Sequence, residues 1–100
     1  MAQMVVVYWR DIPAQVIVKK GRREQFKHVL SERFEKAIDR AAMRGGARDT
    51  DSYLQEWRKS TPLDVSDDLE AEAMKKATEL EQEYDEARLQ SLVETGGVAA

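Results

Sequence analysis

Residues 4–20 read MVVVYWRDIPAQVIVKK, and this stretch decides the fold. Its first six positions are all apolar or aromatic and are rich in valine, a composition that favours a β-strand. Because both faces of this strand are apolar, we expect it to be central in a sheet or covered on both sides. Pro13 interrupts the run, and a second strand is predicted over residues 15–19. Two strands joined by so short a break predict an antiparallel hairpin.

A hairpin alone is marginal in water, so a helix or a third strand must cover it. Apolar residues at spacings of three and four predict a helix over residues 22–44, which Gly45 and Gly46 terminate. Alternatively, Ser31 caps a separate helix, and residues 21–30 form an irregular lead-in. The apolar stripe consists of Phe26, Leu30, Phe34, Ala37, Ile38, Ala41 and Ala42.

Two short elements are predicted next. Asp49 or Thr50 can cap a short helix that continues through Lys59. Residues 61–65 suit a third strand at a sheet edge, where Pro62 is tolerated because an edge strand has unpaired amides.

The last helix is predicted over residues 67–94, since Asp67 and Glu70 resemble a capping box. Its apolar stripe is rich in alanine, and residues 96–100 are expected to form a disordered tail. The predicted fold is therefore α+β, as one domain over residues 1–95. An N-terminal antiparallel hairpin, with or without a third short strand, is covered by two long helices and one short helix.

Charge is distributed unevenly along the chain. Residues 1–63 hold 13 Lys and Arg against 8 Asp and Glu, a net of +5, whereas residues 64–100 hold 3 against 11, a net of −8. This division predicts attraction between the two parts, or a partner for one of them. The opening apolar run is far shorter than the ~20 residues of a membrane span, and no basic leader precedes it. We therefore expect a soluble cytoplasmic protein without membrane contact.

The chain lacks the residues that most catalytic mechanisms need. The chain has no cysteine and one histidine, His28, which excludes the usual zinc sites and thiol nucleophiles. The acidic clusters at 49–51 and 64–70 are explained by helix capping, and the glycines form no phosphate-binding loop. We predict no catalytic residue, no metal and no cofactor.

A candidate binding surface has two parts. The turn between the first two strands combines a large aromatic residue, a charged pair and a rigid proline, which suits a recognition tip. Equally, Trp9 can belong to the core, with Arg10 and Asp11 as a solvated turn. Residues 19–27 hold five Lys and Arg against one Glu, a density that could meet phosphates. With a pI of about 5.2, an acidic protein surface is a more expected partner than nucleic acid. The candidate residues are Trp9, Arg10, Asp11, Pro13, Lys19, Lys20, Arg22 and Arg23.

The strings YWRDIPAQVIVKKGRR and LSERFEKAIDRAAMRGGARDTDSYLQEWRK, with the acidic last helix, resemble a small bacterial family of "virulence factor" domains. That name comes from a larger protein with a similar module at its end. The likeness covers almost the whole chain and is strongest over residues 8–58. It implies no known activity, no catalytic residues and no role in disease. Because relatives tend to be encoded near folate- and corrinoid-dependent methyl-transfer genes, it implies an accessory role in one-carbon metabolism.

The leading hypothesis is a non-catalytic accessory module that binds another protein in the bacterial cytoplasm, either alone or as a homo-oligomer. One alternative is an accessory subunit in methyl transfer. Another is an anionic-ligand or nucleic-acid binder that uses residues 19–27. A pocket beside Trp9 would favour ligand binding if it were lined by Arg33, Asp39, Arg40 or Arg44.

Overall fold

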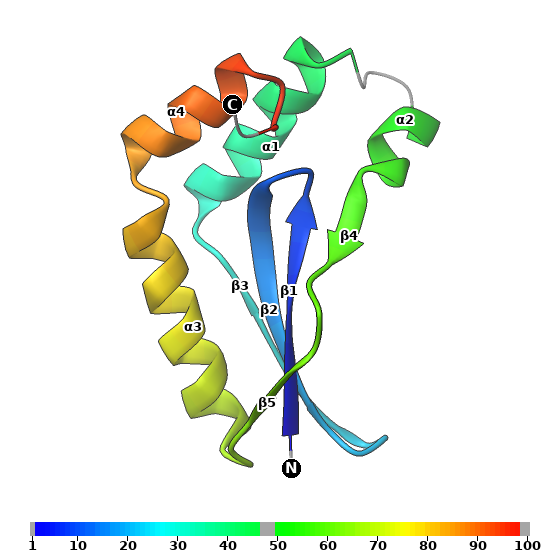
Figure 1. The fold of residues 1–100 in the computed structure, drawn as a ribbon, viewed down its shortest axis with the longest axis vertical. Coiled ribbons are helices and arrows are strands. Elements are labelled where there is room, and N and C mark those ends of the chain that lie inside the picture. Colours follow the sequence, from blue (N-terminus) through cyan, green and yellow to red (C-terminus); the bar gives the residue numbers. More distant parts are fainter. Residues whose placement is uncertain (1, 47–49, 99–100) are drawn as a thin grey trace.

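The computed structural model describes residues 2–46 and 50–98. Its fold is α+β: an antiparallel sheet of five strands packs against helices (Figure 1). The strands lie in the order β3-β2-β1-β4, and β5 pairs with β1 further along the same edge as β4. The elements are β1 (Ala2–Trp9), β2 (Ile12–Lys20), β3 (Glu24–Val29), α1 (Glu32–Arg44), α2 (Thr50–Gln55), β4 (Trp57–Lys59), β5 (Leu63–Val65), α3 (Leu69–Glu83) and α4 (Glu86–Glu94).

The predicted hairpin and the central position of its first strand are both confirmed. β1 pairs with β2 on one side and with β4 and β5 on the other. Its side chains alternate, so that Met4 and Val6 join the main core while Val7 lies on the opposite face. A bulge between Val7 and Tyr8 shifts the register, and Trp9 then pairs with Ile12 at the turn.

The helix predicted from residue 22 is wrong in its first part, because residues 24–29 form β3 along six positions of β2. Helix α1 begins only at Glu32, with Ser31 at its N-cap position. The alternative prediction therefore placed the helix start correctly, but it described the preceding strand as irregular.

The side-chain pattern of β3 explains why this segment is a strand and not a helix. Phe26 and His28 are partly buried, whereas the residues beside them are exposed, as a half-buried strand requires. Its backbone completes a hydrogen-bonded ladder with β2, and this pairing outweighs a weak helical periodicity. The only histidine thus lies on a strand rather than on a helix surface.

The short helix predicted through Lys59 ends at Gln55, and residues 57–59 form β4 instead. Trp57 lies opposite Trp9 there, so pairing with β1 overrides the helical spacing. The third strand predicted over residues 61–65 is confirmed as β5. Asp49, one of the two proposed caps, lies outside the described residues.

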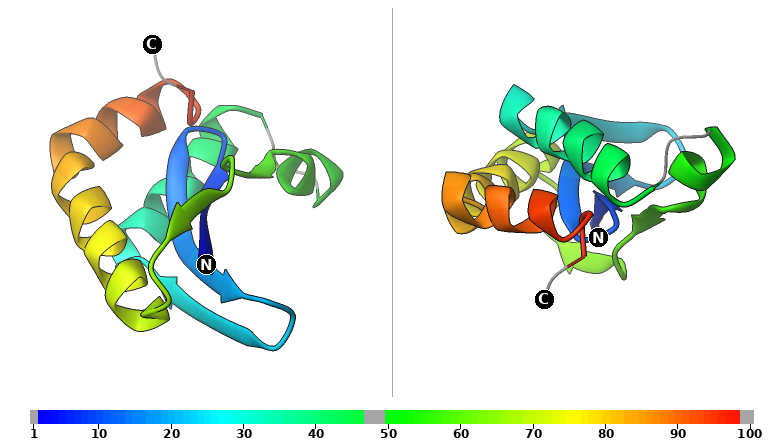
Figure 2. Two further views of the ribbon diagram at one scale, coloured as in Figure 1. Left: turned by 60° about the horizontal axis from the view of Figure 1, so that its bottom comes forward. Right: turned by 90° about the horizontal axis from the view of Figure 1, so that it is seen from above.

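The long last helix is interrupted. Tyr84 ends α3, and the carboxylate of Asp85 accepts a hydrogen bond from Arg88 N at 2.8 Å to begin α4. Asp68, rather than the predicted Asp67, caps α3 by accepting from Ala71 N at 3.2 Å. Because of this break the chain changes direction, and α4 packs on α1 rather than continuing along the sheet (Figures 1 and 2).

The helices therefore cover one face of the sheet. Helix α3 runs along β2, β3 and β1, while α1 and α4 lie at the end that holds the β1–β2 turn (Figure 2). The core between these layers contains Phe34, Leu80 and Leu92, together with residues of β1 and β2. Among the described residues, the opposite face has α2 at one end and no helix over the rest (Figure 1).

Candidate functional site

The predicted recognition tip is largely internal. The side chains of Trp9 and Pro13 are each less than 2% exposed. Trp9 stacks on Tyr53 with ring centroids 5.7 Å apart, and its Nε1 donates to the Tyr53 carbonyl at 2.9 Å. These two side chains are therefore part of the core and do not reach a partner.

Arg10 and Asp11 hold the turn against other parts of the chain. Arg10 has a positive φ of 53°, and its Nη1 donates to the Gly96 carbonyl at 2.7 Å. Asp11 N donates to the Gly97 carbonyl at 2.8 Å. The sequence predicts a disordered tail here, yet the structure buries Gly96 and Gly97 against the turn. Ala99 and Ala100, at the end of that predicted tail, lie outside the described residues.

The basic turn lies at the other end of β2. Eight residue steps of about 3.3 Å separate the two ends of this strand, which places the turns roughly 26 Å apart. Lys20 pairs with Asp67 at 3.4 Å, as the predicted attraction between the two charged parts requires. Within the described chain, Lys19, Arg22 and Arg23 form no ion pair. The two predicted parts therefore do not form one continuous surface.

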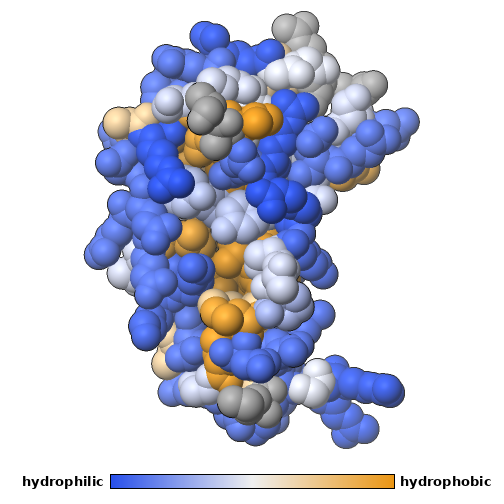
Figure 3. All heavy atoms as spheres, in the orientation of Figure 1, coloured by the Kyte–Doolittle hydropathy of each residue, from blue (hydrophilic) through white to orange (hydrophobic). Residues whose placement is uncertain are grey.

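A different surface, the open sheet face, connects the basic turn to helix α2. Its apolar residues lie along three neighbouring strands; Val7 and Ile17 are buried without joining the main core, and Val29 is 64% exposed. The outline of the molecule is concave here, between α2 and the β2–β3 turn (Figure 3, right). The open sheet face consists of Val5, Val7, Ile17, Lys19, Lys27, Val29 and Lys59.

An aromatic hollow of about 290 Å³ continues this face between α1 and α2. Tyr53 and Trp57 meet edge to face, with ring centroids 5.9 Å apart. Burial raises the pKa of Tyr53 above its ordinary value, and the carboxylates of Asp39 and Glu35 raise it further. Because neither carboxylate has an ion-pair partner in the described chain, this end of the face is negative. The lining also includes Ala14, Gln15, Val29, Leu30 and Ile38.

A larger hollow among the described residues, about 620 Å³, lies on the helix side of the sheet. We call it the Tyr–Arg groove after Tyr8 of β1, Arg58 of β4, Tyr84 at the end of α3 and Arg88 of α4. The Arg58 guanidinium carbon lies 4.8 Å from the Tyr8 ring centroid, and that of Arg88 lies 4.0 Å from the Tyr84 ring centroid. Asp11, Ser60, Thr61, Ser91 and Leu92 complete the lining.

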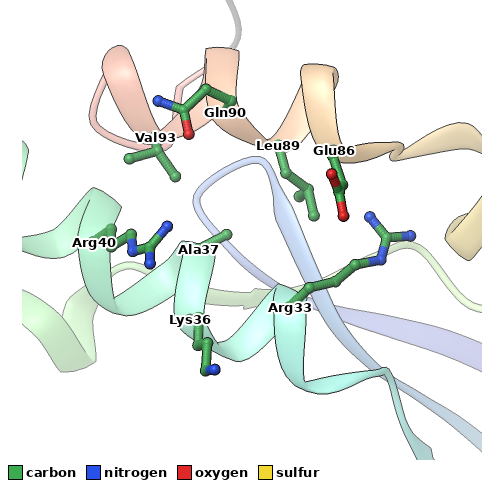
Figure 4. Close-up of a pocket in the computed structure, with 8 residues that line it drawn as sticks. All are labelled: Arg33, Lys36, Ala37, Arg40, Glu86, Leu89, Gln90 and Val93. Carbon is green, nitrogen blue, oxygen red and sulfur yellow. The ribbon is translucent and has the colours of Figure 1, made fainter.

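A third hollow, of about 220 Å³, separates α1 from α4 (Figure 4). Ala37, Leu89 and Val93 face one another across it, while Arg33 and Arg40 lie at its ends. Arg33 is engaged elsewhere, since it donates to the carbonyl of Tyr84 and pairs with a side chain of α3. Trp9 is absent from the linings of these three hollows, including the two that hold the predicted ligand residues Arg33, Arg40 and Asp39.

Sequence reasoning missed the Tyr–Arg groove. The sequence predicts one continuous helix over residues 67–94, which includes Tyr84, and a short helix through Lys59, which includes Arg58. Only the strand geometry of β4 places Arg58 beside Tyr8, and the turn before α4 directs Tyr84 and Arg88 into the same hollow. A signal was nevertheless present, because Tyr84 and Arg88 are four residues apart.

Across the described ranges, no group of three or more acidic or histidine side chains is placed to hold a metal. In the same ranges no helix has the length and apolar character needed to cross a membrane.

Comparison with curated proteins and with solved structures gave no match. A family model described as "Virulence factor" matches residues 7–93, which is most of the chain. This range includes residues 7–9 of β1, all of the other four strands, and α4 except its last residue. The chain therefore belongs to the virulence factor family, as its sequence resemblance implied.

Proposed function

We propose that this chain is a non-catalytic module that binds another protein through its open sheet face. The observation that carries the proposal is the one-sided cover of the sheet. Val7, Ile17 and Val29 form an apolar strip on the face that no helix packs along within the described residues; Val7 and Ile17 are buried, and Val29, at 64% exposed, is its accessible part. Apolar surface rimmed by polar side chains is typical of protein-interaction sites.

The charges around the strip indicate the chemistry of the partner. Lys19, Lys27 and Lys59 lie on the same face, and Arg22 and Arg23 extend the positive charge at its end. An acidic segment of the partner would complement this region, and such rim charges mainly raise the rate of association.

The aromatic hollow at the other end of the face supplies an anchor site. A large apolar side chain can fill the hollow that Tyr53 and Trp57 line, which resembles the pockets that hold interface hot spots. The unpaired carboxylates of Glu35 and Asp39 favour a Lys or Arg next to that anchor. The expected partner segment is thus apolar in its centre, acidic towards β3 and basic towards α1.

A triple charge reversal tests the proposal. Lys19→Glu, Lys27→Glu and Lys59→Glu together invert the rim of the open sheet face. The matched control is Lys36→Glu, Lys75→Glu and Lys76→Glu, which changes net charge equally but lies on helices. Cell extract is passed over each immobilised variant, and each captured protein is purified and titrated against all three chains.

We expect the control to bind within about threefold of the original chain, and the open-face variant at least ten times more weakly, since each exposed pair contributes about 0.2–1 kcal/mol. Affinity should also fall as salt rises. A partner that binds all three chains equally would refute this surface. Capture of nucleic acid instead of protein would favour the alternative of an anionic-ligand binder.

The accessory role in methyl transfer stays a prediction. Identification of the captured protein tests it, because a corrinoid- or folate-dependent enzyme among the specific partners would support it. Light scattering on the purified chain tests the prediction of a homo-oligomer in the same preparation.

A further inference from the structure

The Tyr–Arg groove lies on the opposite side of the sheet from the open face and has no part in the function proposed above. Tyr8 and Arg58 occupy paired positions of β1 and β4, so both point to the helix side. Tyr84 and Arg88 approach from the break between α3 and α4. Four separate elements thus direct cationic and hydroxyl groups into one hollow of about 620 Å³.

Each arginine is held in place by its own contacts. Arg58 Nε donates to the Arg10 carbonyl at 2.9 Å, and its Nη2 donates to the Asp11 carboxylate at 3.1 Å. Arg88 Nη1 donates to the Glu83 carbonyl at 3.3 Å. Stacking on the tyrosine rings fixes both guanidinium planes. Both guanidinium groups are therefore ordered before any ligand binds, which reduces the entropy lost on binding.

Several donors in the groove have no partner among the described residues. They are Arg58 Nη1, Arg88 Nε and Nη2, and the hydroxyl groups of Tyr8, Tyr84, Thr61 and Ser91. Arginine N–H groups match the oxygens of carboxylates and phosphates, often two at a time. Hydroxyl donors around the same point can complete the coordination of such an oxyanion.

The electrostatics of Tyr8 confirm that these groups share one space. Burial raises the pKa of its phenol, and the neighbouring Tyr84 and Glu83 raise it further, while Arg58 and Arg88 lower it. The carboxylates of Asp11 and Glu83 offset part of the positive charge, and Asp11 is already bound to Arg58. Arg88 therefore supplies the positive charge that remains available to a ligand.

We propose that the Tyr–Arg groove binds the phosphate or carboxylate group of a small-molecule ligand. The oxyanion lies between Arg58 and Arg88, and the hydroxyls of Tyr8 and Tyr84 donate to it. The groove is open along its length, so the rest of the ligand extends over Thr61 and Ser91.

The test uses ¹H–¹⁵N NMR titrations of the whole chain with inorganic phosphate and, separately, with acetate at constant ionic strength. We expect saturable shifts at the Arg58 and Arg88 side chains with a Kd on the order of 10 mM or tighter. Tighter binding of phosphate assigns a phosphoryl ligand, and tighter binding of acetate assigns a carboxylate ligand. Shifts that stay linear with either ion up to about 100 mM would overturn the proposal.

Variants separate this site from general charge attraction. Arg88→Gln removes the less constrained cation and should raise Kd at least tenfold, whereas Arg22→Gln, with the same loss of charge, should change Kd less than twofold. Because Arg58→Gln can disturb β4, the pair Tyr8→Phe and Tyr84→Phe is the second probe, since it keeps both rings. It should raise Kd at least tenfold, as expected for losing two hydrogen bonds to an anion. Equal weakening by Arg22→Gln and Arg88→Gln would refute a built site.

Discussion

The two turns at opposite ends of β2 carry similar residues but have opposite environments. The β1–β2 turn holds Arg10 and Asp11, and both are bonded to the segment at residues 96–97. The β2–β3 turn holds Arg22 and Arg23, and both side chains are exposed without an ion pair in the described chain. One turn is therefore a junction inside the fold, whereas the other is a free surface.

The difference shows that the composition of a turn does not reveal what covers it. Charged and aromatic residues at a turn suit recognition, but they suit internal anchoring equally well when another segment returns to the same place. Here the break between α3 and α4 directs the chain end to the β1–β2 turn. At the other end of β2, Asp67 reaches Lys20, but no hydrogen bond or ion pair from another described segment holds Arg22 or Arg23. The predictions below test this contrast, from the largest expected effect to the smallest.

Replacing Trp9 by alanine should have the largest effect on stability. The change empties a fully buried site and removes both the stacking on Tyr53 and the hydrogen bond to its carbonyl. We expect a loss of about 3–5 kcal/mol in the free energy of unfolding. Urea unfolding followed by far-ultraviolet circular dichroism measures it. The matched control is Trp57→Ala, because Trp57 is only partly buried and should cost less. Equal losses would contradict the junction described for the first turn.

Two glycines allow a direct comparison of the turns. Both Gly97 and Gly21 have positive φ, so alanine should cost about 1–2 kcal/mol at either position. At Gly97 a Cβ would also lie 2.9 Å from Cζ3 of Trp9, whereas at Gly21 no atom lies within 4 Å. Overpacking should add about 1–3 kcal/mol to Gly97→Ala alone. If chemical denaturation gives the same loss for both variants, the chain end does not pack on the first turn in solution.

The parts of the fold that could be predicted are those governed by local patterns. The run at residues 4–9 is too apolar and β-branched for anything but a strand, and Pro13 separates it from the next. The edge strand at residues 61–65 was likewise predicted from its length and proline. The strand β3 was missed because Phe26 and Leu30 also fit helical spacing, and only pairing with β2 decides between the two.

The candidate sites were less predictable because they depend on long-range geometry. The open sheet face exists because all covering helices lie on one side, a property that no local spacing encodes. The lysines at 19 and 27 were visible as charge, but their position on one face follows only from the register of β2 and β3. The Tyr–Arg groove required the helix break at Asp85, which a continuous acidic pattern concealed.

Replacing Glu81 should have a smaller effect on the free energy of unfolding, and this effect should depend on pH. Its carboxylate accepts hydrogen bonds from Ser31 N and Oγ, both at 2.8 Å, and from Arg33 at 3.0 Å. Burial alone would raise its pKa, but these bonds outweigh it and hold the pKa below the ordinary 4.5. Glu81→Ala should therefore cost about 1–3 kcal/mol near neutral pH.

The sign of the pH dependence follows from that depressed pKa. The stabilisation by Glu81 is complete above pH 4.5 and is lost as the pH falls through its lower folded value. The difference in free energy of unfolding between the original chain and Glu81→Ala should thus become smaller at acid pH. Denaturation at a series of pH values measures it. Glu79→Ala, an exposed position on the same helix, is the control and should show no such trend. A difference that grows in acid would exclude the proposed hydrogen bonds.

The smallest effect on stability is expected at the free turn. Arg22→Ser with Arg23→Ser removes two exposed side chains and should change the free energy of unfolding by less than about 0.5 kcal/mol. Arg10→Ser removes one arginine from the other turn, yet it loses the bond to Gly96, the pair with Glu56 and the contact with Trp9. Arg10→Ser should lower the free energy of unfolding by about 1–3 kcal/mol, which is more than the double variant although only one charge is lost.

The double variant should instead weaken binding of the partner's acidic segment, since Arg22 and Arg23 extend the positive charge of the open sheet face. A double variant as unstable as Arg10→Ser would mean that the second turn is also a junction, and its arginines would then be unavailable for recognition.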